Sequence, residues 1–138
     1  MIQNRNMTRA AKKRVWVSPK IGLAAAYTEV TETCGFVDPE NNILIRRIDL
    51  IYCIASDGSA TVDTINVGIV GTLGKYAAIV TAISQTAGTV QAATLLNPTV
   101  EVAAGTAVLV SKSGHAGTNT GGVQVAIHYE IIDGDPRP

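Results

Sequence analysis

The chain has 138 residues, which is close to the usual size of one domain and is long enough to bury a core. Hydrophobic residues make up 46% of it and charged residues only 16%, so the aliphatic side chains either fill a core completely or are partly exposed at an interface. Basic and acidic residues balance at 11 each. No membrane span or secretory signal is expected, because Ser18, Pro19 and Lys20 interrupt the apolar stretch 15–26, and a reducing, intracellular site of synthesis fits best.

The residue types favour β-strands. Val, Ile and Thr number 15, 14 and 15, and such β-branched side chains suit the pleated surface of a sheet better than a helix. Thirteen glycines fit a chain with many tight turns. Composition therefore predicts an all-β domain.

The N-terminal part of the chain is basic. The first 28 residues contain six Lys or Arg and no acidic residue, whereas the rest of the chain carries a net charge of −6. Residues 1–14 are predicted to be an arm that becomes ordered only against a partner, followed by a short strand over 15–17. The predicted division is a basic arm with the first short strand over residues 1–20 and a β-sandwich over 21–138.

Two more strands are predicted before the middle of the chain. Residues 27–34 have strand propensity and are followed by a turn over 38–42. The strongest strand covers 43–55, where the alternation of apolar residues slips by one position at Arg46 and Arg47. A β-bulge at that point would keep the apolar side chains of both halves directed inward.

The next strand is predicted to form a hairpin with the strand 43–55. Residues 56–59 read Ser-Asp-Gly-Ser, a hairpin-turn sequence, and 62–70 alternate as a strand. The segment 71–86 has two interpretations. Tyr76 and the aliphatic residues after it have helical spacing, but a strand over 79–83 after a single helical turn is preferred.

Four segments complete the chain. A weak strand is predicted over 89–96, a short apolar segment over 99–102, a strand over 107–111, and the last long strand over 123–132, after a loop rich in Gly, Thr and Asn. About eight strands without regular β-α alternation indicate a β-sandwich or barrel.

Histidine and cysteine are too few to suggest a metal site. The two His and two Cys have no zinc-ligand spacing, so no metal ligand is predicted. His128 lies in the last strand and is interpreted as a sheet-face residue with a hydrogen-bond partner. Cys34 and Cys53 lie on different predicted strands, so a disulfide is geometrically possible, but two buried thiols are preferred.

No catalytic group is predicted either. His115 lies among glycines, where a nucleophile and its base would not be held in a fixed mutual geometry. The glycine-rich stretch 68–76 lacks the Ser or Thr that a phosphate-binding loop needs after Lys75. The protein is therefore expected not to be an enzyme and to use no cofactor.

The basic arm carries the candidate binding residues. It could contact nucleic-acid phosphates, dock on a protein surface or stay solvated. Protein contact is preferred, and direct nucleic-acid contact is not expected. An aromatic residue beside the arm would serve as the anchor. The candidate partner-binding residues are Arg5, Arg9, Lys12, Lys13, Arg14, Trp16 and Lys20.

Two parts of the chain resemble small virion proteins of tailed phages. In 63–72, a strand containing Val-Gly is followed by a turn and then by a Lys-Tyr pair. In 102–110, an Ala-Gly-Thr turn precedes a strand, and in 121–132 a glycine-rich loop leads to a final strand that contains Tyr-Glu. The resemblance spans about residues 43–132 and rests on turn and strand motifs.

The resemblance implies a jelly-roll virion protein of the capsid decoration (cement) type. The expected fold class is then all-β: an antiparallel jelly-roll-like β-sandwich of about eight strands with an extended N-terminal arm. Homo-oligomers, expected to be trimers, would lie on the capsid exterior of the virion and cement the major capsid protein, after synthesis in the host cytoplasm. The alternative is a carbohydrate- or other ligand-binding β-sandwich of a phage tail or fibre, which would need exposed aromatic side chains.

Overall fold

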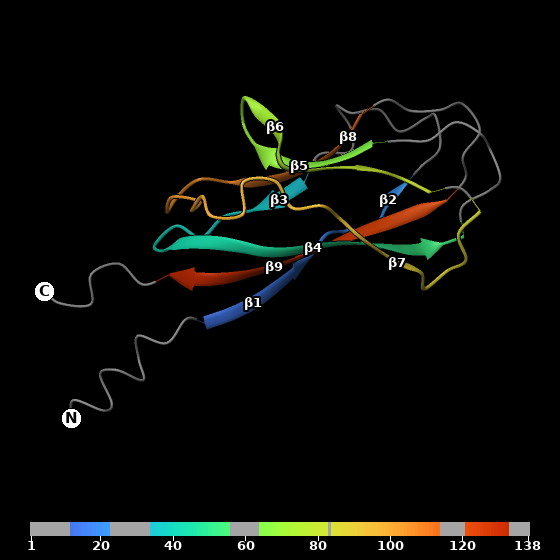
Figure 1. The fold of residues 1–138 in the computed structure, drawn as a ribbon, viewed down its shortest axis with the longest axis horizontal. Coiled ribbons are helices and arrows are strands. Elements are labelled where there is room, and N and C mark those ends of the chain that lie inside the picture. Colours follow the sequence, from blue (N-terminus) through green and yellow to red (C-terminus); the bar gives the residue numbers. More distant parts are fainter. Residues whose placement is uncertain (1–11, 23–33, 56–63, 83, 114–120, 133–138) are drawn as a thin grey trace, which may run out of the picture.

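The computed structural model describes residues 12–22, 34–55, 64–82, 84–113 and 121–132. These residues form nine strands and no helix, so they contain no helix that could span a membrane (Figure 1). The strands are β1 (Lys12–Val17), β2 (Ile21–Gly22), β3 (Cys34–Phe36), β4 (Asn42–Ile54), β5 (Thr64–Ile69), β6 (Thr72–Val80), β7 (Val90–Ala92), β8 (Val108–Ser113) and β9 (Gly122–Ile132). The all-β prediction is confirmed.

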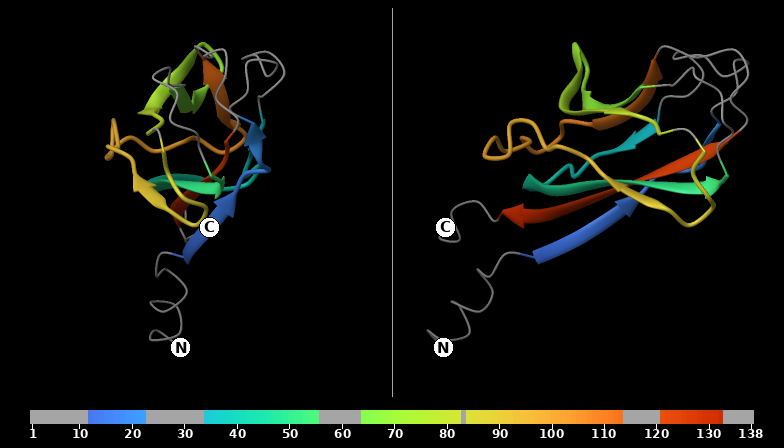
Figure 2. Two further views of the ribbon diagram at one scale, coloured as in Figure 1. Left: turned by 90° about the vertical axis from the view of Figure 1, so that its right-hand side faces the viewer. Right: turned by 45° about the vertical axis from the view of Figure 1, so that its right-hand side comes forward.

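The strands form two antiparallel sheets that lie in two layers (Figures 1 and 2). One sheet has the order β1-β9-β4-β7, with β2 paired to the start of β9, and the other has the order β3-β8-β5-β6. Every second side chain of a strand points into the space between the two sheets, because successive residues of a β-strand face opposite sides. The fully buried members include Ile48, Leu50, Tyr52, Ile65, Val67, Val108, Val110, Val123, Val125 and Ile127. The predicted β-sandwich is therefore present.

The strand predicted over 43–55 is β4, and its bulge is confirmed. β4 pairs along its length with β9, and the register shifts between Ile45 and Arg47. Because the shift inserts one residue, Ile45 and Ile48 both point inward and both are buried. A second shift after Tyr52 reverses the direction again, so Ile54 is 42% exposed although it was expected to face the core.

The predicted hairpin between 43–55 and 62–70 is wrong. β4 pairs with β9 and β7, whereas β5 pairs with β6 and β8 in the opposite sheet. Both strands alternate correctly, but alternation shows which face of a strand is buried and not which strand lies beside it. The turn predicted at 56–59 lies outside the described residues, as does most of the strand predicted at 27–34.

The hairpin in this region joins β5 to β6. Its turn contains Gly71, with a φ of 87°, which residues with a side chain rarely adopt. The single helical turn predicted before a strand at 79–83 is wrong, because the chain is extended from the start of β6. Opposite Ile65, Ile79 is buried against the core, and this burial outweighs the helical preference of the neighbouring alanines.

The remaining elements differ from the predictions mainly in length. The strand predicted at 89–96 is reduced to β7, and the segment 99–102 contributes one bridge, between Val102 and Ile43. The last long strand is confirmed as β9. Cys34 and Cys53 are half-buried and form no disulfide.

β8 extends two residues beyond its predicted end and carries a buried lysine. Lys112 lies opposite Ile65, on the core side of the sheet, and is 0% exposed. Its Nζ donates a hydrogen bond to the carbonyl oxygen of Gly22 in β2, at 3.1 Å. The bond connects the two sheets, because β8 and β2 belong to different ones.

Two buried serines differ in their hydrogen bonds. The Ser18 hydroxyl accepts a hydrogen bond from the backbone N–H of Val125 at 2.9 Å, which extends the pairing with β9 beyond the end of β1. The Ser111 hydroxyl is buried without a hydrogen-bond partner. Burying a hydroxyl without a hydrogen-bond partner costs free energy, and a hydrogen bond to the hydroxyl offsets that cost.

We expect Ser111→Ala to leave the free energy of unfolding unchanged or slightly higher, and Ser18→Ala to lower it by about 1–2 kcal/mol. The first substitution removes a hydroxyl whose burial nothing offsets, and the second leaves the Val125 amide without its acceptor. Urea unfolding followed by circular dichroism measures both values. A loss of more than about 1 kcal/mol in Ser111→Ala would show that its hydroxyl has a partner in solution.

Candidate protein-binding site

Five of the seven candidate binding residues lie in the described part of the chain. Four belong to β1 and one follows it: Lys12, Lys13, Arg14 and Trp16, and then Lys20. Arg5 and Arg9 lie outside the described residues. The first strand starts at Lys12 and not at Val15, because the basic residues 12–14 pair with β9 in the same register as the apolar residues after them.

β1 is an edge strand of its sheet. Among the described strands it pairs with β9 alone, so its other edge is not covered by a neighbouring strand (Figure 1). Lys13, Val15 and Val17 stand opposite residues on the outer face of β9, and Trp16 stands opposite the buried Ile127. The strand therefore presents one basic and two apolar side chains outward and its aromatic side chain inward.

Trp16 attaches β1 to the opposite sheet. Its ring lies 5.1 Å from the ring of Phe36 in β3, and Phe36 in turn stacks on Tyr129 of β9 at 5.0 Å. Aromatic pairs at such distances are stabilising beyond the area that they bury. This cluster fixes the position of β1 and hence of the basic side chains on it.

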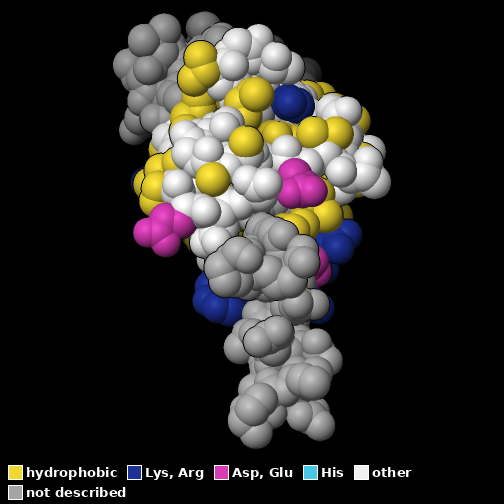
Figure 3. All heavy atoms as spheres, turned by 90° about the vertical axis from the view of Figure 1, so that its left-hand side faces the viewer, with side chains coloured by type: hydrophobic (Ala, Val, Ile, Leu, Met, Phe, Trp, Pro, Cys, Tyr) yellow, Lys and Arg dark blue, Asp and Glu magenta, His cyan; other side chains and the backbone are white. Residues whose placement is uncertain are grey.

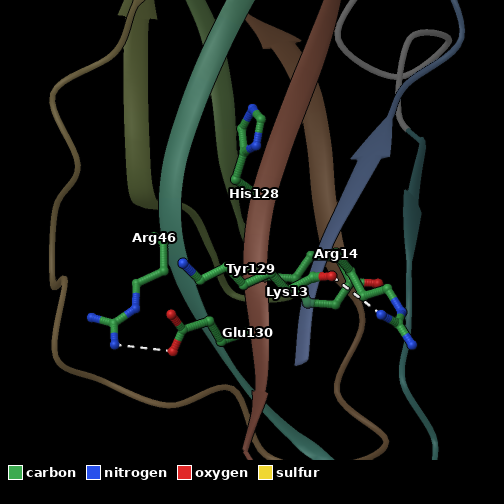
Figure 4. Close-up of a pocket in the computed structure, with 6 residues that line it drawn as sticks. All are labelled: Lys13, Arg14, Arg46, His128, Tyr129 and Glu130. Carbon is green, nitrogen blue, oxygen red and sulfur yellow. Dashed lines mark hydrogen bonds and ion pairs between the residues drawn. The ribbon is translucent and has the colours of Figure 1, made fainter. Parts of the chain in front are cut away.

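A pocket of about 330 Å³ lies over β1, β9 and the bulge of β4 (Figure 4). Arg46 at the bulge forms an ion pair with Glu130 of β9, with 3.0 Å between Nη2 and Oε2. Lys13 extends across β9 toward β4, whereas Arg14 points away from this ion pair and donates to the carbonyl oxygen of Lys13. The six lining residues are Lys13, Arg14, Arg46, His128, Tyr129 and Glu130.

A second charged group borders the pocket. The Asp49 carboxylate is 8% exposed and lies 2.9 Å from Nε of Arg47 and 3.5 Å from Nε2 of His128. His128 lies on the outer face of the sheet, as predicted, and the hydrogen-bond partner expected for it stays a prediction. The ion pair with Arg47 offsets the negative charge of Asp49.

Positive charge therefore predominates in the pocket. Its lining contains three basic residues, Lys13, Arg14 and Arg46, and a single acidic one, Glu130, whose side chain is 14% exposed. Figure 3 shows basic side chains gathered at the lower part of the end where β1 begins, with hydrophobic side chains over the part above. Such a pocket can bind an anionic group. No three His, Cys, Asp or Glu side chains of the described residues converge to hold a metal ion.

The contributions of β4 and β9 to this pocket were not identified from the sequence. Arg46 and Glu130 are 84 positions apart, and only the register of the two strands brings them together. The bulge was the available signal, because β-bulges often redirect a side chain beside a functional site.

Comparison with known proteins shows a similarity of fold. No family model and no curated protein matches the sequence. The structure is similar to a chain of a solved structure described as a cyanophage Pam1 capsid asymmetric unit, with a TM-score of 0.52 and 18% identity. The match covers 87% of this chain and 85% of that chain, so the likeness extends over nearly the whole sandwich.

Proposed function

We propose that this protein is a structural component of a phage virion that decorates and cements the capsid through contacts with the major capsid protein. The observation that carries the proposal is the similarity of fold to a chain of a cyanophage capsid asymmetric unit over 87% of the sequence. The turn and strand motifs that resemble capsid decoration proteins support the same class.

The geometry of β1 suits a role in protein contact. Its outer edge is not covered by any described strand, and its outward side chains combine the positive charge of Lys13 with Val15 and Val17, which are 54% and 45% exposed. Interfaces commonly combine exposed apolar side chains with charges that fix the orientation of the partner. We place the contact with the major capsid protein on this strand and on the basic residues before it.

The proposed mechanism is multivalent. A small domain gains little affinity from one weak contact, whereas a homo-oligomer such as a trimer binds through several contacts at once. Each additional contact is then intramolecular, so the whole oligomer dissociates much more slowly than one subunit. Placement on the capsid exterior would let one oligomer connect neighbouring capsid subunits.

The alternative, a carbohydrate-binding module, has less support. Sugar-binding platforms generally use exposed aromatic rings. The aromatic side chains in the described part of the chain are instead buried or packed against the core: Trp16, Phe36, Tyr52, Tyr76 and Tyr129. Tyr27 lies outside the described residues.

We expect the purified protein to bind saturably to capsids assembled from the major capsid protein of the same phage, and to raise their thermal stability. Cosedimentation measures the occupancy, and electron cryomicroscopy of the complex locates the bound sandwich. A truncation of residues 1–11, which leaves β1 complete, should fold normally and be retained much less, because it removes two of the basic residues. Absence of the protein from purified virions, with no binding to capsids, would contradict the proposed function.

A further inference from the structure

We propose that the pocket over β1, β9 and β4 receives the carboxylate of an Asp or Glu side chain on the partner protein, with Lys13 as the main cation. The identity of the partner as the major capsid protein rests on the proposed function. The chemistry of the site rests on the pocket itself.

Lys13 is the cation in the pocket that is available for an incoming anion. Arg46 is already paired with Glu130, and Arg14 points away and donates to a backbone oxygen. Lys13 extends across β9 toward β4, and among the described residues it forms no ion pair. A carboxylate entering the pocket would therefore gain the Lys13 ammonium without displacing an existing pair.

The charge of the pocket suits a group with one negative charge. Glu130 lies in the pocket wall with its side chain 14% exposed, and it would repel a group with two negative charges more strongly than a carboxylate. His128 adds a ring that can donate a hydrogen bond, and its Nε2 lies 3.5 Å from the Asp49 carboxylate.

The surroundings of the pocket favour a protein over a nucleic acid. Val15 and Val17 follow Lys13 on the same face of β1, and both are about half exposed. These apolar side chains offer nothing to a phosphate backbone, which is bound mainly through its charge. A protein surface can cover the two valines with its own apolar groups while one acidic side chain enters the pocket.

The test compares two charge reversals in the full chain. Lys13→Glu changes the pocket, and Lys75→Glu makes the same charge change in β6 of the other sheet. A blocked peptide of three glutamates, titrated into isotope-labelled protein, should shift the amide signals of Lys13, Arg46 and His128. Lys13→Glu should weaken this binding at least about tenfold, and Lys75→Glu should leave it within about twofold, since distant surface charges contribute little.

Further measurements separate this proposal from the proposed function. Lys13→Arg should retain the peptide affinity, and circular dichroism should show Lys13→Glu to be folded, because Lys13 is exposed. If Lys13→Glu binds the peptide and capsids as wild type does, the pocket proposal is wrong and the capsid function stands. If Lys13→Glu weakens peptide binding but the wild-type protein does not bind capsids, the carboxylate site stands and the proposed function is wrong. Stronger binding of a single-stranded oligonucleotide than of the peptide, also lost in Lys13→Glu, would overturn the carboxylate assignment.

Discussion

Gly68→Ala should lower the free energy of unfolding by about 3 kcal/mol or more. Gly68 lies where the register between β5 and β6 shifts, and a Cβ built on it would collide with the backbone of Thr72 and Leu73 in the hairpin partner. Backbone atoms cannot rotate away as a side chain can, so the hairpin would have to separate. Chemical unfolding of the variant, or its failure to accumulate as folded protein, measures the effect.

Two other glycines of the same hairpin are the controls. Gly71→Ala places its Cβ in open space but keeps a φ of 87°, and should cost about 1 kcal/mol through backbone strain. Gly74→Ala meets its nearest atom, Oδ1 of Asn66, at 3.4 Å, and should change stability by less than about 0.5 kcal/mol. Equal losses in all three variants would show that close approach at Gly68 is not the cause.

The second large effect is expected at Tyr52. Its side chain is fully buried, and its hydroxyl accepts a hydrogen bond from the Ala82 amide at 2.7 Å and donates one to Oε1 of Gln91 at 2.6 Å. Tyr52→Phe should cost about 2 kcal/mol, because the two hydrogen bonds of the hydroxyl, from the Ala82 amide and to the Gln91 oxygen, are lost. Tyr52→Ala should cost about 4 kcal/mol, because it also leaves a cavity.

The same residue predicts a dependence of stability on alkaline pH. Burial raises the pKa of Tyr52 above its ordinary value of 10.0, because the phenolate would lose its hydration in the core. The neutral phenol is therefore favoured by folding. The stabilisation that this group contributes is fully present below the pKa that Tyr52 has in the unfolded chain. It is lost as the pH rises through the pKa that Tyr52 has in the folded protein. Urea unfolding between pH 8 and about 11 should show that the free energy of unfolding declines more steeply in wild type than in Tyr52→Phe. Identical slopes would mean that another group causes the loss of stability at alkaline pH. Tyr76 is such a group, because burial also raises its pKa.

Local sequence patterns predicted the positions of the strands well, but they predicted poorly which strands pair with each other. Alternation identified β4, its bulge and β9, because each of these depends on which side chains face the core. The hairpin expected between 43–55 and 62–70 failed because an Asp-Gly turn sequence does not distinguish a hairpin from a connection that crosses to the other sheet. The helical turn predicted before 79–83 failed because its alanines, which lie within β6, favour a helix only where burial in a sheet does not compete.

The candidate site was predictable in part. Charge asymmetry identified Lys13 and Arg14 from the sequence, since a run of basic residues needs no tertiary information to be noticed. It did not show that these residues belong to a strand, nor that Arg46 and Glu130 complete a pocket with Lys13. Both facts depend on pairing with β9, which lies more than a hundred residues after β1.

The position of β9 has a consequence for the biogenesis of the protein. β9 lies between β1 and β4, so neither strand has its main partner until the C-terminal part of the described chain has been synthesised. At ordinary translation rates the nascent chain waits on the order of ten seconds before β9 can pair with the backbone groups along the edge of β4. Pairings between strands so distant in sequence also make folding slow, because the entropy of closing the long loop must be lost first. Production of the soluble protein should therefore depend more on chaperones and on low growth temperature than its small size would indicate.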